Sequence, residues 1–206
     1  MSKSVYKKLD DYITNDDFTF DLNEQPTVQD FETVIGEKSI LVAECKLNTP
    51  ENFPKSRGEY YDVIDPNYDG KKVHYESLSP SWDDTTREWL YFLVYNNHIV
   101  KIGQTIQSLK DRYCSSYSAG TARNMKTGTA STTNFIISEC NALAVSKGMS
   151  VQIYGLPVEK EKKIIERFGL IRECVLSVVR DKETMLIASF KNTYQHKPVL
   201  GVQEGK

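Results

Sequence analysis

Hydrophobic and polar positions follow a regular order between Trp89 and Tyr117. Residues 89–95 form a dense aromatic and aliphatic run, Asn96 and Asn97 are typical of a turn, and His98 begins an alternating, β-branched segment that reaches Gly103. Residues 108–117 then carry a helical period. The pattern predicts two antiparallel strands followed by a helix.

Two cations fall on the apolar sides of these elements. Lys101 alternates with Val100 and Ile102 along the second strand, and Arg112 lies within the stripe of Leu109 and Tyr113 on the helix. Burying a charge costs free energy unless the charge is paired, so an unpaired one indicates a function. Both residues are therefore candidates for a functional site.

The same reading predicts further elements on both sides of this segment. A helix should follow Thr27 and end at Gly36, and a strand should cover Ile40–Cys45. Downstream, we expect a helix over Phe135–Lys147 with Thr133 or Asn134 as its N-cap, and a strand over Ser150–Leu156. Pro157 and Gly169 bracket a third expected helix.

In that third helix, a carboxylate occupies a position where the period requires an apolar residue. Val158, Glu161, Ile165 and Phe168 share one face. An inward Glu is either a structural residue with satisfied hydrogen bonds or part of a site, and the pattern alone leaves both readings open.

Charge divides the chain at Trp89. Residues 1–88 contain 10 Lys and Arg against 19 Asp and Glu, whereas residues 89–206 contain 16 against 9. A basic part of this size suits a polyanionic partner, although an acidic arm that packs on it would explain the charges equally well. We therefore expect two units: an acidic extension over 1–88, serving as an arm, dimer contact or DNA contact, and a core over 89–206.

The basic part contains a long interval without acidic residues, from Arg112 through Ser138. Its glycines, hydroxyl groups and the cations Arg123 and Lys126 are donors of the kind that hold phosphate oxygens. The amides at the start of the following helix would face the same surface. A flexible loop with a good N-cap is the alternative.

No apolar run approaches the length of a membrane span, and the first residues lack the apolar segment of a signal peptide. We expect a cytoplasmic protein of a bacterial or phage-infected cell, with no membrane partner. The four cysteines are far apart and form no CxxC pair, which predicts free thiols.

Several of these motifs, taken in order, resemble the GIY-YIG nuclease superfamily. Leu90-Tyr91-Phe92 stands where the family has GIY, and Lys101-Ile102-Gly103 stands where it has YIG. Lysine at the first position of the second motif resembles the compact type II restriction endonucleases of the superfamily. Arg112, the block GTASTTN over 128–134, the strand VQIYGL, Glu161 in EKKIIERFG and the terminal HKPVLGV continue the match.

The resemblance implies a fold, a reaction and a set of site residues. The fold would be α+β, with a small antiparallel three-stranded sheet flanked by helices. The function would be hydrolysis of phosphodiester bonds in duplex DNA by a type II restriction endonuclease acting as a homodimer. Alternatives are a phage or mobile-element nuclease of looser specificity, or a DNA-binding module without activity.

By the same resemblance, Tyr91 would activate the attacking water, helped by the cation Lys101. Arg112 would hold a non-bridging oxygen of the scissile phosphate, and Tyr117 would bond near the nucleophile. Glu161 would be the single protein ligand of one Mg²⁺ or Mn²⁺ per site. The expected DNA contacts are Gln104, Arg123, Lys126, Ser131, Thr132, Thr133, Asn134, His196 and Lys197.

If the site exists, the hairpin must bring Tyr91 and Lys101 to one face of the sheet. A regular two-residue turn pairs Tyr95 with His98 and places Phe92 opposite Lys101, so that Tyr91 and Lys101 face opposite sides. We therefore expect either a turn with an odd number of residues or a bulge in one strand.

Overall fold

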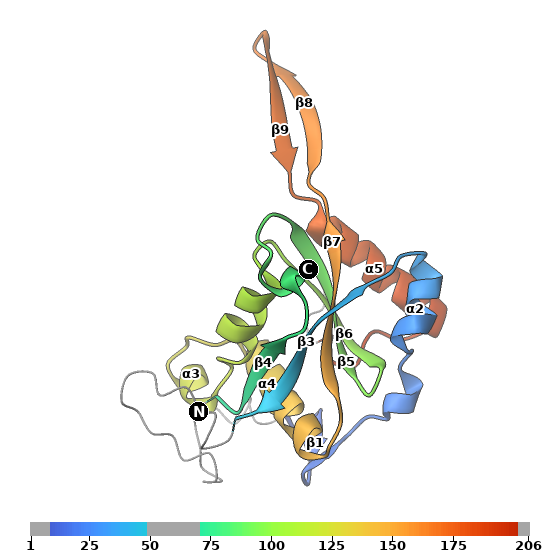
Figure 1. The fold of residues 1–206 in the computed structure, drawn as a ribbon, viewed down its shortest axis with the longest axis vertical. Coiled ribbons are helices and arrows are strands. Elements are labelled where there is room, and N and C mark those ends of the chain that lie inside the picture. Colours follow the sequence, from blue (N-terminus) through green and yellow to red (C-terminus); the bar gives the residue numbers. More distant parts are fainter. Residues whose placement is uncertain (1–8, 49–70, 202–206) are drawn as a thin grey trace.

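The computed structural model describes residues 9–48 and 71–201. Its centre is an antiparallel five-stranded sheet in the order β4-β3-β7-β5-β6 (Figure 1). The strands of this sheet are β3 (Ile40–Leu47), β4 (Val73–Ser77), β5 (Glu88–Tyr95), β6 (His98–Thr105) and β7 (Val151–Val158). The expectation of three strands is wrong, because the segment before Trp89 contributes β3 and β4 to the same sheet.

Both faces of the sheet are covered by helices. The helices, in chain order, are η1 (Leu22–Glu24), α2 (Val28–Ile35), η2 (Pro80–Asp83), η3 (Asp111–Tyr117), α3 (Ala122–Lys126), α4 (Thr132–Ser146) and α5 (Val179–Tyr194). One hydrophobic core joins the sheet to η3 and α4, and the other joins it to α2 and α5. β5 lies between the two cores and is buried along its whole length.

The two predicted strands of the first hairpin are confirmed, and the connection carries the expected irregularity. Asn96 and Asn97 form a two-residue turn with φ of 44° and 72°, and Tyr95 pairs with His98. A bulge then shifts the register, so that Val94 pairs with Ile99 but Leu93 pairs with Lys101. Val100 is the extra residue, and it restores the parity that the site needs.

Several local predictions are confirmed. Thr27 caps α2 by accepting from the amide of Asp30, and Gly36 ends the helix with a left-handed φ of 69°. The strands expected over 40–45 and 150–156 are present as β3 and β7. All four cysteines are free thiols. Within the described residues, no helix combines the length and apolar character needed to cross a bilayer.

The expected helix between Pro157 and Gly169 is wrong. Strand β7 runs on to Val158, and the chain then forms a β-hairpin of β8 (Glu161–Arg167) and β9 (Leu170–Leu176). Phe168 and Gly169 make its two-residue turn with φ of 55° and 74°. Gly169 therefore lies in a hairpin turn and does not end a helix. Glycine is favoured at both positions, so the sequence alone does not distinguish them.

The N-cap of α4 and the polar loop after Tyr117 also differ from the expectation. Ser131, not Thr133 or Asn134, caps α4, and its side chain accepts from the amide of Asn134 at 3.2 Å. The polar loop after Tyr117 contains the short helix α3. A two-residue β-ladder of β1 (Ile13–Thr14) and β2 (Asp17–Phe18) precedes η1. Parts of the acidic arm, 1–8 and 49–70, lie outside the described residues.

Candidate active site

The bulge in β6 places Tyr91 and Lys101 on the same face of the sheet. Tyr91 pairs with Gly103, and Leu93 pairs with Lys101, so all four residues face η3 and α4. A Cβ atom at Gly103 would overlap the phenol of Tyr91. Glycine at this position therefore gives the Tyr91 ring the space to lie across the neighbouring strand.

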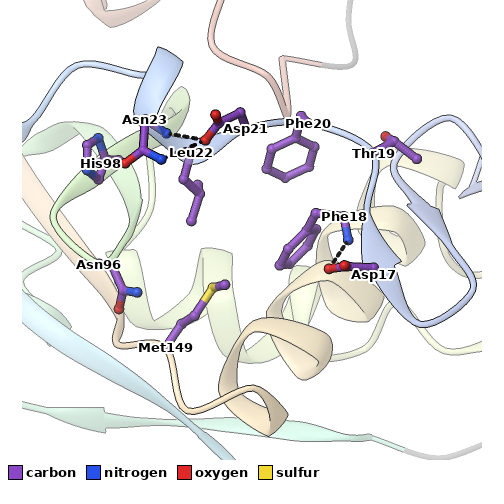
Figure 2. Close-up of a pocket in the computed structure, with 10 residues that line it drawn as sticks. All are labelled: Asp17, Phe18, Thr19, Phe20, Asp21, Leu22, Asn23, Asn96, His98 and Met149. Atoms are coloured by element: carbon purple, nitrogen blue, oxygen red, sulfur yellow. Dashed lines mark hydrogen bonds between the residues drawn. The ribbon is translucent and has the colours of Figure 1, made fainter.

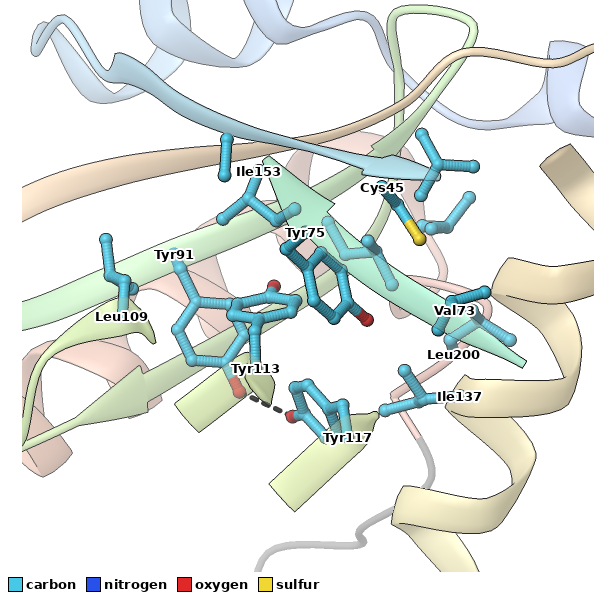
Figure 3. Close-up of a cluster of buried hydrophobic side chains, with 14 of the residues drawn as sticks. Cys45, Val73, Tyr75, Tyr91, Leu109, Tyr113, Tyr117, Ile137, Ile153 and Leu200 are labelled. Atoms are coloured by element: carbon cyan, nitrogen blue, oxygen red, sulfur yellow. Dashed lines mark hydrogen bonds between the residues drawn. The ribbon is translucent and has the colours of Figure 1, made fainter. Parts of the chain in front are cut away.

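Arg112 and Tyr117 reach the Tyr91 phenol from η3. The Tyr91 and Tyr117 hydroxyl groups share a hydrogen bond of 2.5 Å, shown as a dashed line in Figure 3. Arg112 donates from Nε to the Tyr91 oxygen at 3.3 Å and from Nη2 to the Tyr117 oxygen at 3.0 Å. A guanidinium with two rigid donors thus holds both phenols at once.

The helical geometry of η3 explains this contact. Its residues follow the wider π-helical turn, and the Ser118 amide donates to the Tyr113 carbonyl five residues back at 2.8 Å. In an α-helix the residue four positions after Arg112 would be its neighbour. The π turn makes Tyr117 that neighbour, and π turns are frequent at functional sites.

Burial shapes the protonation of these groups. Desolvation raises the pKa of Tyr91 above its ordinary value, opposed by the charge and hydrogen bond of Arg112 and by the bond to Tyr117. Burial disfavours the charged guanidinium, but interaction with the Tyr91 and Tyr117 phenols raises the pKa of Arg112 overall. Arg112 therefore stays charged, and Tyr91 is a neutral phenol in the free protein.

Lys101 is buried next to this group. Desolvation lowers its pKa to about 8, the charge of Arg112 adds to the effect, and Glu183 opposes it. Its Nζ donates to the Leu200 carbonyl at 3.4 Å. We expected Lys101 to supply the cation beside Tyr91, but in the structure Arg112 makes that contact.

A polar cavity of about 200 Å³ opens over these side chains. Its lining residues come from β5, β6, η3, the start of α4, and α5: Tyr91, Lys101, Gly103, Gln104, Arg112, Ser131, Thr133, Asn134 and Glu183. The side-chain oxygen of Gln104 is buried and has no hydrogen-bond partner among the described residues. Such a group is free to meet a ligand.

Glu183 is the carboxylate of this cavity, and the sequence reading missed it. It is partly buried on α5, where desolvation raises its pKa and the charges of Lys101, Arg112 and Arg180 oppose that shift. Val179, Leu186 and Phe190 are the buried residues of the helix. Glu183 lies on the same face of the helix as these three residues. A carboxylate at an apolar position was the reason for selecting Glu161, and the same criterion selects Glu183 once α5 is known to be a helix.

Glu161 lies elsewhere. It is the first residue of β8, its side chain is exposed, and it does not line the cavity. The expectation of an inward Glu161 depended on the helix that the structure replaces with a hairpin.

The expected DNA contacts separate into two groups. Gln104, Ser131, Thr133 and Asn134 line the cavity, and Thr132 lies beside them in the first turn of α4. Arg123 is exposed on α3, and the side chain of Lys126 lies outside the described part of the chain.

The terminal residues of that set are not in the cavity lining. His196 hydrogen-bonds with the Glu24 carbonyl at 3.1 Å and packs edge-on against Phe190, and Lys197 is exposed next to it. The His196 ring therefore packs against the core beneath α2 and α5, on the other face of the sheet from Tyr91.

Comparison with solved structures finds a chain of similar fold. A restriction endonuclease, HPY188I, solved in complex with product DNA, matches 89% of this chain and 90% of its own, with 22% identity and a TM-score of 0.51. The chain shares its fold with that endonuclease. A mutant of bacteriophage T4 EndoII also matches, with 13% identity, coverage of 81% and 95%, and a TM-score of 0.48. No protein-family model and no curated protein matches the sequence.

A larger cavity of about 570 Å³ lies between the N-terminal segment and the first hairpin (Figure 2). Among the residues that the structure describes, its lining includes the carboxylates of Asp17 and Asp21 beside Phe18, Phe20 and Met149, and no Lys or Arg. Two carboxylates without a Lys or Arg beside them in the lining disfavour a phosphate ligand. The smaller cavity over Tyr91 is therefore the candidate active site.

The residues of the site fit a metal ion that has few protein ligands. Within the described residues, no three acidic, histidine or cysteine side chains form a cluster that could hold a metal ion. Mg²⁺ is commonly bound through one or two carboxylates with water and phosphate oxygens. In the described part of the chain, Glu183 is the one carboxylate that lines the cavity, so the donor set suits such an ion when a phosphate is also present.

Proposed function

We propose that the protein is a metal-dependent DNA endonuclease of the GIY-YIG type, which hydrolyses phosphodiester bonds in duplex DNA. The observation that carries the proposal is the convergence of one phenol, two cations and one carboxylate on a single small cavity, with the buried Tyr117 hydroxyl bonded to two of these groups. A binding module does not need this combination. The endonuclease fold supports the same reading.

Arg112 binds the scissile phosphate in this proposal. It is charged and directed into the cavity, and a bidentate guanidinium suits two phosphate oxygens. Ser131, Thr133 and the first amides of α4 hold the neighbouring backbone. Charge that develops on the phosphorane oxygens is thus met by donors already in place.

Tyr91 accepts the proton of the attacking water. A phenol with a raised pKa must first lose its own proton, and Lys101, whose pKa is lowered to about 8, lines the same cavity. The reactive form of the pair carries one proton fewer than the resting form. In this proposal the two groups titrate together, so the proton belongs to the pair and not to either residue. Tyr117 and Arg112 orient the resulting phenolate.

Glu183 is the residue that would hold Mg²⁺ or Mn²⁺. When bound, the ion supplies Lewis-acid stabilisation to the phosphate and to the departing 3′-oxygen. We assign to Glu183 the role expected of Glu161, because Glu183 lines the cavity and Glu161 does not.

The test is cleavage of supercoiled plasmid with Mg²⁺, with and without a chelator, followed by sequencing of the fragment ends. Recurrent ends would show a sequence-specific restriction endonuclease, and scattered ends would show looser specificity. Tight duplex binding without any nicking would contradict the catalytic proposal. We further expect two subunits for each double-strand break, because each chain has one site.

A further inference from the structure

The β8–β9 hairpin, residues 161–176, projects from the body of the molecule beyond the ends of β7 and α5 (Figure 1). Each strand has seven residues, which corresponds to a length of about 23 Å. Its two strands form a sheet of their own, separate from the central sheet. An isolated two-stranded hairpin is marginally stable in water, so this hairpin needs a surface to pack on. Residues 161–176 are called the arm below.

The side chains of the arm indicate what that surface is. Of the eleven exposed large hydrophobic residues in the described chain, six belong to the arm: Ile164, Phe168, Leu170, Ile171, Val175 and Leu176. Phe168 at the tip is 98% exposed. The arm also carries four cations and three carboxylates, so its charges nearly cancel. A DNA contact requires an excess of cations, whereas exposed apolar residues with balanced charge suit a protein surface.

We propose that the arm packs against the arm of a second copy of this chain. The proposal takes from the proposed function only the expectation that two subunits act on one duplex. The arm's sixteen residues approach the roughly 20–30 residues per side of a standard protein interface. Neighbouring surface of the body would supply the remainder.

On one face of the arm, the groups at the root are complementary to those near the tip. Directly opposed residues share a face, so the pair Glu161 and Leu176 at the root lies on the same face as the pair Arg167 and Leu170 near the tip. Two arms related by a two-fold axis across their middle bring root against tip. Glu161 then meets Arg167 of the partner subunit, and Leu176 meets the partner's Leu170.

The charges on this face are available for such pairing. Glu161, Lys163, Arg167 and Arg172 form no salt bridge with another described residue. On the opposite face, Lys162 already pairs with Glu173 at 2.8 Å. The face that contains Glu161 and Arg167 is therefore the one that gains ion pairs from a second copy.

The root of the arm connects directly to the candidate active site. β7 pairs Gly155 with Tyr91, and β9 leads through Ser177 into the helix that carries Glu183. Ser177 donates to the Glu88 carboxylate at 2.9 Å and fixes the root to β5. Contact between two arms would therefore set the distance between two sites on one duplex.

The first experiment measures self-association without DNA or metal, so that its result does not depend on nuclease activity. By sedimentation velocity we expect the wild type to be dimeric at micromolar concentration. Leu170→Lys should raise the dimer dissociation constant by about 100-fold, as for an interface hot spot. Leu170 is 72% exposed, so the folded subunit should keep its melting temperature.

Two matched variants sharpen the result. Leu78→Lys, at a residue 52% exposed on the body, should leave the dimer unchanged. Glu161→Arg and Arg167→Glu should each weaken the dimer by about tenfold, and the double variant should restore it, because like charges at an interface repel.

A monomeric wild type, or a dimer that Leu170→Lys leaves intact, would overturn the proposal. If Leu170→Lys stays dimeric but loses duplex binding in a gel-shift assay, the arm contacts DNA instead. A variant that becomes monomeric, still nicks plasmid and no longer linearises it in single binding events would support the arm contact and the proposed function together.

Discussion

Arg112 and Tyr117 are five residues apart, yet the guanidinium donates to the phenol at 3.0 Å because η3 is π-helical. An α-helix makes the same contact with a spacing of four. Deleting Ser115, which is exposed, should let η3 relax to an α-helix and keep Tyr117 beside Arg112.

We therefore expect the Ser115 deletion to retain nicking activity, and insertion of one Ala after Ser115 to abolish it. Plasmid nicking and the melting temperature of both variants provide the measurement. Equal losses of activity in the two would show that the π turn has a further role.

Removal of the Glu183 carboxylate should separate binding from chemistry. Glu183→Gln is expected to abolish Mg²⁺-dependent cleavage and to keep duplex affinity within a few fold, because the amide retains the shape and loses the charge that holds the ion. The control is Glu161→Gln, which should keep nicking within about fivefold, since Glu161 lies outside the cavity and its proposed exposed ion pair with Arg167 of the partner subunit is worth at most about 1 kcal/mol. Cleavage that survives in Glu183→Gln would remove Glu183 from the metal site.

Three neighbouring tyrosines should respond differently to loss of the hydroxyl group. Tyr91→Phe removes the base and should abolish cleavage, and Tyr117→Phe should reduce it. The Tyr113 hydroxyl is buried without a hydrogen-bond partner among the described residues. Tyr113→Phe should therefore keep activity and raise the free energy of unfolding by about 1 kcal/mol. Urea unfolding and plasmid nicking measure the two effects, and destabilisation by Tyr113→Phe would reveal a missed partner.

The pH dependence of cleavage should follow the pair of Tyr91 and Lys101. Because burial and Arg112 lower the pKa of Lys101 to about 8, the pair loses its proton near that pH. The single-turnover rate should rise with pH below about 8 and level off above it. A rate that is flat between pH 6 and 9 would exclude this proton from the reaction.

Lys101 should also destabilise the fold that it serves. Its pKa is about 8 in the folded protein against an ordinary 10.5, so the unfolded chain binds more protons between these values. The free energy of unfolding therefore rises with pH across this window and is lowest below pH 8. Replacement by an uncharged residue, Lys101→Met, should add about 2–3 kcal/mol at pH 7 while it abolishes cleavage. Urea unfolding at pH 7 and pH 10 tests both the size and the sign.

Local sequence patterns determined a large part of this structure. The run from Trp89 to Tyr95, the Asn96-Asn97 turn and the caps Thr27 and Gly36 follow rules that act over a few residues. If Tyr91 and Lys101 share a site, the need for an odd turn or a bulge between them also followed from the sequence, because strand parity is a counting constraint. The same patterns selected the cations Lys101 and Arg112, whereas Tyr91 and Tyr117 joined them through the resemblance to GIY-YIG nucleases.

Tertiary structure decided where the carboxylate comes from. Residues 157–169 carry a helical period, an initial Pro and a final Gly, yet they extend β7 and turn at Phe168-Gly169 into a projecting hairpin. Glu183 enters the cavity only because α5 packs on the sheet beside β6. Hydrogen bonds between strands and contacts between distant segments outweigh local propensity here, and no pattern within a short window reports them.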